Sequence, residues 1–346
     1  MRLLIIQTAP LGGILSALPV LDYLHQAVPE VEIDWVVDEE YREVLEGNPL
    51  LGTLHTVKTG DWRKLPRAIS VVREIGQLKE ALLGREYRFV FDLEGSFNSG
   101  LIGRLTGAQD RIGFEKSEVA DKGNLFFSMR RVPLRRQDVN DTHKCLRLVS
   151  IPFAKDYRSM ELSGGIVTGP ADDLAAEALL ATLSDGLVFL FDCGADWKTK
   201  LWSEQGWSEL ARQVVDSFSE VTILLSWVTE EERELATRLA KSVTAARVLD
   251  RQSLKGMAAL LKKVDLVVGA DNDTVKMAAA LGTPTVSFYR ATDGKRRGPC
   301  GEHHVVVQSP IHCARCLRAQ CDKDSQCRGT IKTEALLAGI RSLFGS

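Results

Sequence analysis

The 346-residue sequence lacks three features that would each mark a familiar class of protein. No apolar run reaches the roughly 18–20 residues that a membrane-spanning helix needs. No strong basic excess is present, because 44 lysines and arginines stand against 46 aspartates and glutamates, and this argues against a dedicated nucleic-acid binder. No G-x-G-x-x-G fingerprint follows an expected strand, so a Rossmann-type oxidoreductase is poorly supported. The remaining composition is that of an ordinary globular protein.

The N-terminal segment resembles a signal peptide at first sight, with Arg2 before an apolar stretch. Polar and helix-breaking residues interrupt that stretch, among them Gln7, Thr8 and Pro10. We therefore expect a strand, a loop and an amphipathic helix here, and a cytoplasmic protein; a cleaved signal sequence is the alternative.

Cysteine is scarce except in one segment. Five of the seven cysteines fall within residues 300–327, and in a cytoplasmic protein such a cluster favours a metal or free thiols over a disulfide framework. Cys313, Cys316, Cys321 and Cys327 could close a tetrahedral structural zinc site. Their spacing is not one of the standard zinc-knuckle patterns, so free or redox-active thiols and disulfides stay open as alternatives. We expect no metal or other cofactor in catalysis.

Apolar strand patterns alternate with amphipathic helix patterns along the whole chain. This alternation predicts parallel sheets with right-handed crossovers, and the length favours two domains. The connection between them is expected within 152–170, which carries a Gly-Gly pair and a Gly-Pro pair. We predict an α/β protein with two Rossmann-like domains, 1–165 and 166–346, facing each other across a cleft. The final helix, 333–343, is expected to pack on either domain.

The most informative stretch is VDLVVGADNDTVKMAAALGTPTVSFY, residues 264–289. It predicts a buried strand, a polar turn over 269–274, a short helix from Val275 to Leu281 and a second strand from Thr285. A strand that feeds a helix through a polar turn presents free backbone N–H groups at the carboxyl edge of the sheet. That edge is where open α/β sheets bind phosphate-bearing ligands.

Four stretches, which begin at Arg2, Phe91, Gly194 and Gly269, carry motifs in a fixed order. Together they resemble one family, the heptosyltransferases of glycosyltransferase family 9. RLLIIQTAPLGGILSALPVL resembles the family's strand–Leu-Gly-Asp–helix start, and FDLEGSFNSGLIGRLTGAQDRIGF its second N-terminal signature. GADWKTKLWSEQGWSELA resembles its Lys-x-Trp loop and helix. GADNDTVKMAAALGTPTVSFYRATDGKRRGPCG resembles its Asp-(Ser/Thr)-Gly-x-x-His turn and the loop that follows. The cysteine cluster after it also resembles one that many members carry. The matches follow the expected order from residue 2 to about 327.

The resemblance implies a GT-B fold, with an N-terminal acceptor domain and a C-terminal nucleotide-sugar domain. It implies a metal-independent, inverting glycosyltransferase that moves a heptose from an ADP-sugar to the inner core of lipopolysaccharide. Negative charge develops on the leaving diphosphate, and Lys200 is the candidate side chain to stabilise it, helped by the helix dipole near Thr274. A solvated lysine at a helix start is the alternative. The resemblance places the donor at Lys200, Glu230, Glu231, Asp271, Asn272, Asp273, Thr274 and Lys276, and the acceptor at Thr8, Gly12 and Gly13. Glu230 and Glu231 could instead simply favour a helix N-terminus.

The sequence departs from the family pattern at chemically important positions. Gly13 stands where the family has the Asp thought to deprotonate the acceptor, and glycine cannot act as a base. In the donor turn the family's Gly is Asp273 and its His is Lys276, while Arg290-Ala291 stand where Gly-Pro is expected. Asp273 should repel a diphosphate unless its side chain caps the helix. The alternative function is a catalytically weakened homologue that binds a nucleotide, a sugar or a partner.

Two basic groups are candidates for contact with an anionic lipid-linked acceptor or with the cytoplasmic face of the inner membrane. One is Arg130, Arg131, Arg135 and Arg136, and the other is Lys295, Arg296 and Arg297. Solvated loops are the alternative for both groups. The sequence does not identify the sugar, the nucleotide or the acceptor.

Overall fold

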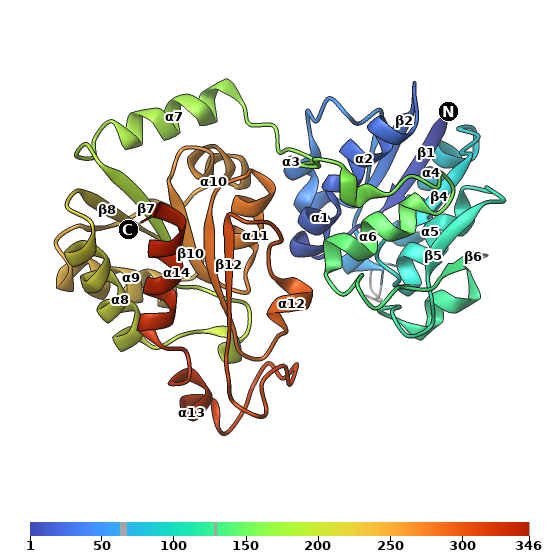
Figure 1. Ribbon diagram of the computed structural model, residues 1–346. Helices are drawn as coiled ribbons and strands as arrows, with labels where there is room; N and C mark the ends of the chain where they lie inside the picture. The colour runs from blue at the N-terminus through green and yellow to red at the C-terminus, as the bar shows by residue number, and fades with distance from the viewer. Residues whose placement is uncertain (63–67, 128–129, 346) are drawn as a thin grey trace. The chain divides into compact units, whose positions relative to one another are not determined.

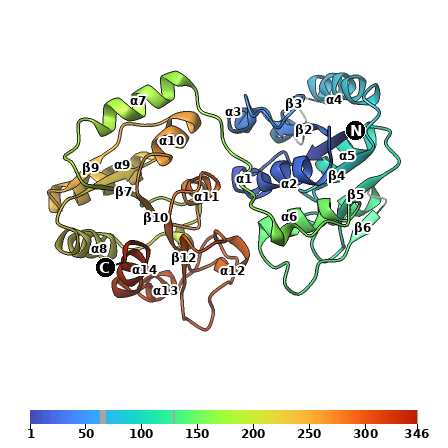
Figure 2. The same cartoon turned by 45° about the horizontal axis from the view of Figure 1, so that its top comes forward.

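The computed structural model describes residues 1–62, 68–127 and 130–345, and the chain divides into two compact units (Figure 1). Unit 1 is Met1–Val167 and unit 2 is Thr168–Ser346, so the boundary lies two residues after the expected one. Each unit is a parallel six-stranded sheet with helices on both faces (Figures 1 and 2). The predicted fold class, α/β with two Rossmann-like domains, is confirmed.

The sheet of unit 1 has the strand order β3-β2-β1-β4-β5-β6. Its strands are β1 (Arg2–Ile6), β2 (Glu32–Asp38), β3 (Leu54–Val57), β4 (Phe89–Asp92), β5 (Arg111–Phe114) and β6 (Arg130–Val132). Its helices are α1 (Leu11–Ala17), α2 (Pro19–Ala27), α3 (Arg42–Leu45), α4 (Ala68–Leu83), α5 (Phe97–Leu105) and α6 (Asp141–Ser150). Because β1 is covered on both faces, it is a continuous apolar run in which Leu3, Leu4, Ile5 and Ile6 are all fully buried.

The sheet of unit 2 repeats this arrangement with the order β12-β11-β10-β7-β8-β9. Its strands are β7 (Leu187–Asp192), β8 (Val221–Ser226), β9 (Ala246–Val248), β10 (Leu266–Ala270), β11 (Thr285–Tyr289) and β12 (His304–Gln308). Its helices are α7 (Pro170–Leu180), α8 (Glu204–Ser217), α9 (Glu230–Ser242), α10 (Leu254–Leu261), α11 (Asp273–Ala280), α12 (Gly294–Arg297), α13 (Asp324–Arg328) and α14 (Thr333–Phe344).

The final helix, α14, packs on unit 2. Leu336 and Ile340 are fully buried in that unit's core, and the Phe344 ring lies 5.2 Å from the ring of Phe189 on β7. The same core holds Trp202 and Trp207, whose rings are 5.3 Å apart and which both pack on Phe288. This aromatic cluster fixes the start of α8, and with it the loop that precedes α8, against the sheet.

Both sheets have a topological switch point, where the chain leaves two neighbouring strands in opposite directions. In unit 1 the switch point lies between β1 and β4, whose residues Leu3–Ile6 pair with Phe89–Asp92. In unit 2 it lies between β7 and β10, whose residues Phe189–Asp192 pair with Leu266–Gly269. Ligands of open α/β sheets bind outside the carboxyl ends of the strands at such points. A ligand site is therefore expected at the loops that follow these two pairs of strands.

Several sequence predictions were wrong in detail. Three strands at sheet edges, β3, β6 and β12, were not predicted, because edge strands are only partly buried and lack a strong apolar pattern. The sequence pattern predicts a glycine-containing turn and a helix from about Ile14, but α1 begins at Leu11, so Gly12 and Gly13 belong to its first turn. The pattern also predicts a loop over 94–100, but α5 begins at Phe97.

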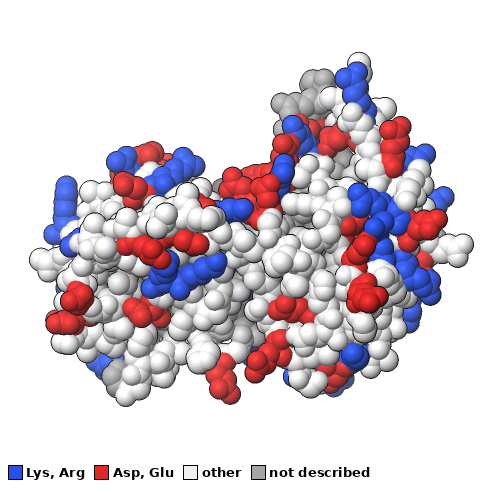
Figure 3. Space-filling model, turned by 90° about the horizontal axis from the view of Figure 1, so that it is seen from above, with Lys and Arg blue, Asp and Glu red and all other residues white. Residues whose placement is uncertain are grey.

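The described residues include no helix that is long and apolar enough to cross a membrane. On the face drawn in Figure 3, acidic and basic side chains are interspersed. Within the basic group of unit 1, Arg131 donates to the carbonyl oxygens of Phe114 and Asn124, and Arg135 binds Asp138. These two arginines therefore stabilise the loops around them as well as carrying charge.

Candidate functional site

At the switch point of unit 2, Lys200 and Asp271 meet from two different loops. Lys200 ends a short 3₁₀ turn after β7, and Asp271 directly follows β10. The Nζ of Lys200 lies 3.1 Å from Oδ2 of Asp271 and 2.8 Å from Oδ1 of Asp196, and 4.9 Å from the ring centre of Trp197. Lys200 is only 5 % exposed, so it is not the freely solvated lysine of the alternative interpretation.

Asp271 is the centre of a group of cations. Burial by itself would raise the pKa of its carboxyl, but Lys276, Lys200 and Arg297 together hold that pKa below its usual value. The Nζ of Lys276 lies 3.9 Å from Oδ1 of Asp271. Asp196 and Asp273 lie near the same cations, so the charges at this edge nearly balance, and a diphosphate would bind by drawing Lys200 and Lys276 away from these carboxylates.

The polar turn over 269–274, in which most of the predicted donor residues lie, differs from the predicted geometry. Helix α11 begins at Asp273, two residues earlier than expected, and its N-cap is Asn272, whose Oδ1 accepts from the N–H of Val275 at 3.0 Å. Asp273 is therefore an exposed first-turn residue and does not cap the helix. The Nδ2 of Asn272 donates to the carbonyl oxygen of Gly194 at 3.1 Å, which joins the two loops of the switch point.

Asp192 lies beneath these loops at the carboxyl end of β7. Burial, together with the charge of Glu232, raises the pKa of its carboxyl to about 6, although hydrogen bonds from Thr274 and from the N–H of Gly194 favour the anion. Thr274, predicted as a donor contact, thus also supports Asp192.

Glu230 and Glu231, the other predicted donor residues, lie at the start of α9. Both are exposed in the first turn of α9, and Glu230 lies 3.4 Å from Arg233. Their neighbour Glu232 accepts from the N–H groups of Val228 and Thr229 and lies against Gly194. The sequence signal for it was present, since Thr229-x-x-Glu232 is a capping-box spacing.

In unit 1 the predicted acceptor residues lie together at the corresponding switch point. Thr8, two residues after β1, is fully buried, and Gly12 and Gly13 follow in α1. Glu94, in the loop after β4, was not predicted as a site residue. Its Oε2 accepts from the N–H of Thr8 at 2.7 Å, from the Thr8 hydroxyl at 2.5 Å and from the N–H of Ala9 at 3.3 Å.

Comparison with known proteins decides the family. The model of glycosyltransferase family 9 (heptosyltransferase) matches residues 75–326. Lipopolysaccharide heptosyltransferase 1 of Pseudomonas aeruginosa is 30% identical over 93% of this chain and 87% of its own length. The chain belongs to glycosyltransferase family 9. A solved structure of E. coli heptosyltransferase WaaC with ADP superposes with a TM-score of 0.77 at 24% identity, covering 99% of this chain and 100% of that one. A second, with ADP-2-deoxy-2-fluoro heptose, gives 0.76 at 25% identity and 99% of each chain.

In this family 9 glycosyltransferase, Arg290 directly follows β11. Arg290 is 1 % exposed, and its guanidinium donates to the carbonyl oxygen of Leu201 and to Oδ1 of Asp324 at 2.5 Å. The backbone carbonyl oxygen of Arg290 also accepts a hydrogen bond from the N–H of Arg315. Arg290 thereby joins the Lys200 loop to the cysteine-rich segment, a role that the sequence could not reveal because none of these partners is near it in the chain.

The cysteine-rich segment of this family member does not gather its thiols. All seven cysteines are free, and within the described part of the chain no three His, Cys, Asp or Glu side chains lie close enough together to hold a metal ion. In this arrangement the thiols do not form a tetrahedral site, and structural zinc stays one of the alternatives that the sequence leaves open. Metal analysis of the purified, untagged protein tests it: about one zinc ion per chain would support the zinc site, and none would remove it.

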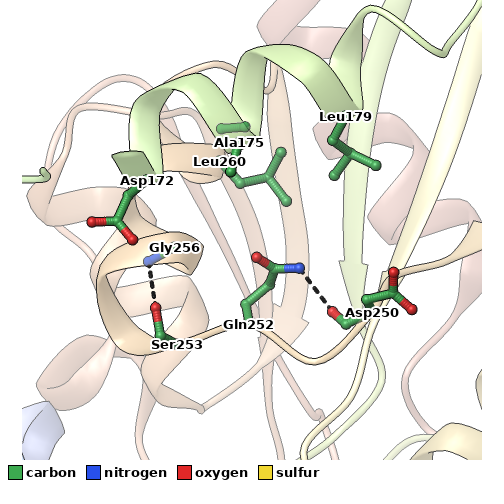
Figure 4. A pocket seen from close by; sticks show the side chains of 9 residues that line it. Asp172, Ala175, Leu179, Asp250, Gln252, Ser253, Gly256 and Leu260 are labelled. Carbon is green, nitrogen blue, oxygen red and sulfur yellow. Dashed lines mark hydrogen bonds between the residues drawn. The ribbon is translucent and has the colours of Figure 1, made fainter. Parts of the chain in front are cut away.

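A pocket of about 270 Å³ between α7 and α10 of the transferase lies apart from the Lys200 loops (Figure 4). Its polar lining groups are engaged locally: the Ser253 hydroxyl accepts from the N–H of Gly256, and Gln252 donates to the carbonyl oxygen of Asp250. None of the predicted donor or acceptor residues lines it.

Proposed function

We propose that this glycosyltransferase transfers a heptose from ADP-heptose to a lipopolysaccharide inner-core acceptor, with inversion at the anomeric carbon and without a metal. The observation that supports this most is the group of cations at Asp271, which lies at the switch point of unit 2. The named relatives are lipopolysaccharide heptosyltransferases, and two similar solved structures hold ADP or an ADP-heptose analogue.

The proposed donor site uses Lys200 and Lys276 to bind the diphosphate. Both ammonium groups face Asp271, which holds them at the edge of the sheet. A diphosphate has more negative charge than one carboxylate and can draw both cations toward itself. The same cations stabilise the charge that grows on the leaving diphosphate, and no metal is needed for that task.

The other donor candidates have supporting parts in this proposal. Asn272 fixes the N-terminus of α11, and Asp273, Glu230 and Glu231 are exposed at helix starts beside the loops. Asp273 is an unfavourable charge that Asp196 and Asp271 add to, since its carboxylate is in the first turn of α11, where it opposes a diphosphate. Lys276, one turn along the same helix, offsets it.

The acceptor side is proposed to lie at Thr8, Gly12 and Gly13 in unit 1. A second candidate function follows from Gly13, which has no side chain to take a proton. On that account the chain would bind ADP-sugars but transfer nothing. The two candidates are separated by measuring ADP release from ADP-heptose, with and without heptose-free lipopolysaccharide precursor. Acceptor-dependent release supports transfer, and a raised melting temperature with ADP but no release supports the binding module.

Contact with the inner membrane is a further part of the proposal, because the acceptor is a lipid. Helix α12 carries Lys295, Arg296 and Arg297 in succession, and such short basic runs contribute about 1 kcal/mol per cation near an anionic surface. Flotation of the protein with vesicles of anionic and of neutral lipid tests it. Binding to the anionic vesicles alone, reduced at high salt, is the expected result.

A further inference from the structure

Transfer to a sugar hydroxyl needs a group that accepts the hydroxyl proton, and Gly13 cannot supply it. Two carboxylates stand at the switch point of unit 1, Asp92 at the end of β4 and Glu94 two residues later. A third, Asp38, ends the neighbouring strand β2. These three differ in how many of their oxygens are already used.

In Asp92 and Asp38 both carboxylate oxygens already accept hydrogen bonds within the fold, so neither oxygen is left for a ligand. Oδ1 of Asp92 accepts from the N–H groups of Glu94 and Gly95, and its Oδ2 accepts from Asn124 at 2.6 Å. Oδ1 of Asp38 accepts from the N–H of Glu40, and its Oδ2 accepts from the N–H and hydroxyl of Thr59. Each carboxylate therefore uses both oxygens within the fold.

Glu94 differs from them because all three of its hydrogen bonds fall on one oxygen. Oε2 accepts from Thr8 and Ala9, whereas Oε1 has no hydrogen bond from any described residue. The side chain is half-buried, so Oε1 is within reach of solvent. A carboxylate anchored through one oxygen with the other open is held in place for proton transfer.

Glu94 and Gly13 also contact the same short loop. Glu94 binds the N–H of Ala9, while the Gln7 amide donates to the carbonyl oxygen of Ala9 at 3.0 Å. A Cβ built on Gly13 would lie 2.7 Å from Nε2 of that Gln7 amide. Position 13 therefore has no carboxylate, but the carboxylate of Glu94, in the loop after β4, contacts the same segment.

We propose that Glu94 is the general base of the transfer reaction. The inference rests on the proposed heptosyl transfer. Oε1 of Glu94 takes the proton of the acceptor hydroxyl as that oxygen forms its bond to the anomeric carbon. The bond from the anomeric carbon to the diphosphate breaks at the same time, and its electron pair leaves on the diphosphate of ADP. The proton on Glu94 then passes to water, which restores the carboxylate.

The test compares Glu94→Gln with Glu43→Gln, an exposed glutamate of the same unit. A glutamine can still accept from Thr8 but cannot take a proton. The kcat of Glu94→Gln should fall by about 10²–10⁴-fold, while KM for ADP-heptose and the melting-temperature shift caused by ADP stay as in the wild type. Glu43→Gln should keep full activity. A Glu94→Gln protein with wild-type kcat overturns the proposal.

Chemical rescue separates a base from a merely structural residue. Glu94→Ala leaves space at the loop, and added formate should raise its kcat at least tenfold with no effect on the wild type. A folded Glu94→Ala protein that formate does not activate also overturns the proposal. If the wild type itself transfers nothing from ADP-heptose, the proposed function fails, and that outcome is distinct from a loss confined to the Glu94 variants.

Discussion

The ammonium nitrogen of Lys200 lies 3.1 Å from Oδ2 of Asp271, although the two residues belong to loops that leave different strands. They meet because β7 and β10 pair in parallel and both loops leave at the carboxyl edge. Thr8 and Glu94 meet in the same way after β1 and β4 in unit 1. Each unit thus places one charged contact at its switch point, and in our account the two contacts serve the donor and the acceptor.

Replacing Lys200 by methionine removes the cation closest to Asp271 and leaves Lys276 as its main partner. We expect kcat/KM with ADP-heptose to fall by about 10²–10³-fold, in the range for removing one group that stabilises transition-state charge. The shift in melting temperature caused by ADP should also shrink. Lys198→Met is the matched control, since Lys198 lies in the same turn but is exposed. Equal activity of the two variants would contradict the donor role of Lys200.

Asp192 gives a prediction for stability against pH. Burial raises the pKa of its carboxyl from 3.8 to about 6 in the folded protein. Between these two values the unfolded chain has lost the proton and the folded protein still holds it. The contribution of Asp192 to the free energy of unfolding therefore falls as the pH rises, by about 3 kcal/mol in all, with no further loss above the folded pKa.

An Asp192→Asn variant cannot ionise and so escapes this loss. Denaturant unfolding of variant and wild type, from about pH 4 to about pH 7, should show their stability difference moving by about 3 kcal/mol in favour of the variant. Asp185→Asn, at an exposed position, should show no such trend. A stability difference for Asp192→Asn that does not change with pH would show that the carboxyl is not perturbed.

Arg290→Met tests the link between the Lys200 loop and the cysteine-rich segment. The change removes the hydrogen bonds of Arg290 to Leu201 and Asp324, although Asp324 keeps Arg328, and losing hydrogen bonds that involve a charged group costs about 1.5–3 kcal/mol. Urea denaturation should show that loss, and activity should fall because Lys200 is no longer fixed. Arg251→Met, at an exposed position of unit 2, should stay within about 0.5 kcal/mol of the wild type. An Arg290 variant as stable as this control would contradict the link.

Contact with the membrane through α12 is checked by the pair Lys295→Gln and Arg296→Gln in one protein. Arg297 is kept because it contributes to the charge around Asp271. We expect binding to anionic vesicles to weaken by about 1 kcal/mol for each cation removed, while activity on a lipid-free acceptor is unchanged. Unaltered vesicle binding would remove α12 from the proposed contact surface.

The central strands could be predicted from the sequence, and the edge strands mostly could not. β1, β7 and β10 are covered on both faces, so their apolar runs stand out between glycine-bearing turns. β6 has one buried residue among three, and β12 is only partly buried along its whole length. A strand at the edge of a sheet buries fewer side chains than a central strand, so its sequence shows a weaker apolar pattern.

Residues of the candidate site could be predicted from the sequence, but the contacts between them could not. Lys200 and Asp271 each stood in a recognisable motif, yet their meeting depends on the order of the strands. Glu94 lies within a recognisable motif, but its importance follows from the pairing of β1 with β4, which brings it to Thr8. Arg290 could be seen only as a departure, because its partners come from three separate segments. Long-range contacts of this kind have no local signature.

The most direct test of the account is mass spectrometry of heptose-free lipopolysaccharide core precursor after incubation with the wild-type protein and ADP-heptose, with UDP- and GDP-sugars as parallel donors and no added metal. The account predicts an acceptor heavier by one heptose with ADP-heptose alone, and equal release of ADP. An acceptor of unchanged mass, with a protein that is folded and binds ADP, would contradict it.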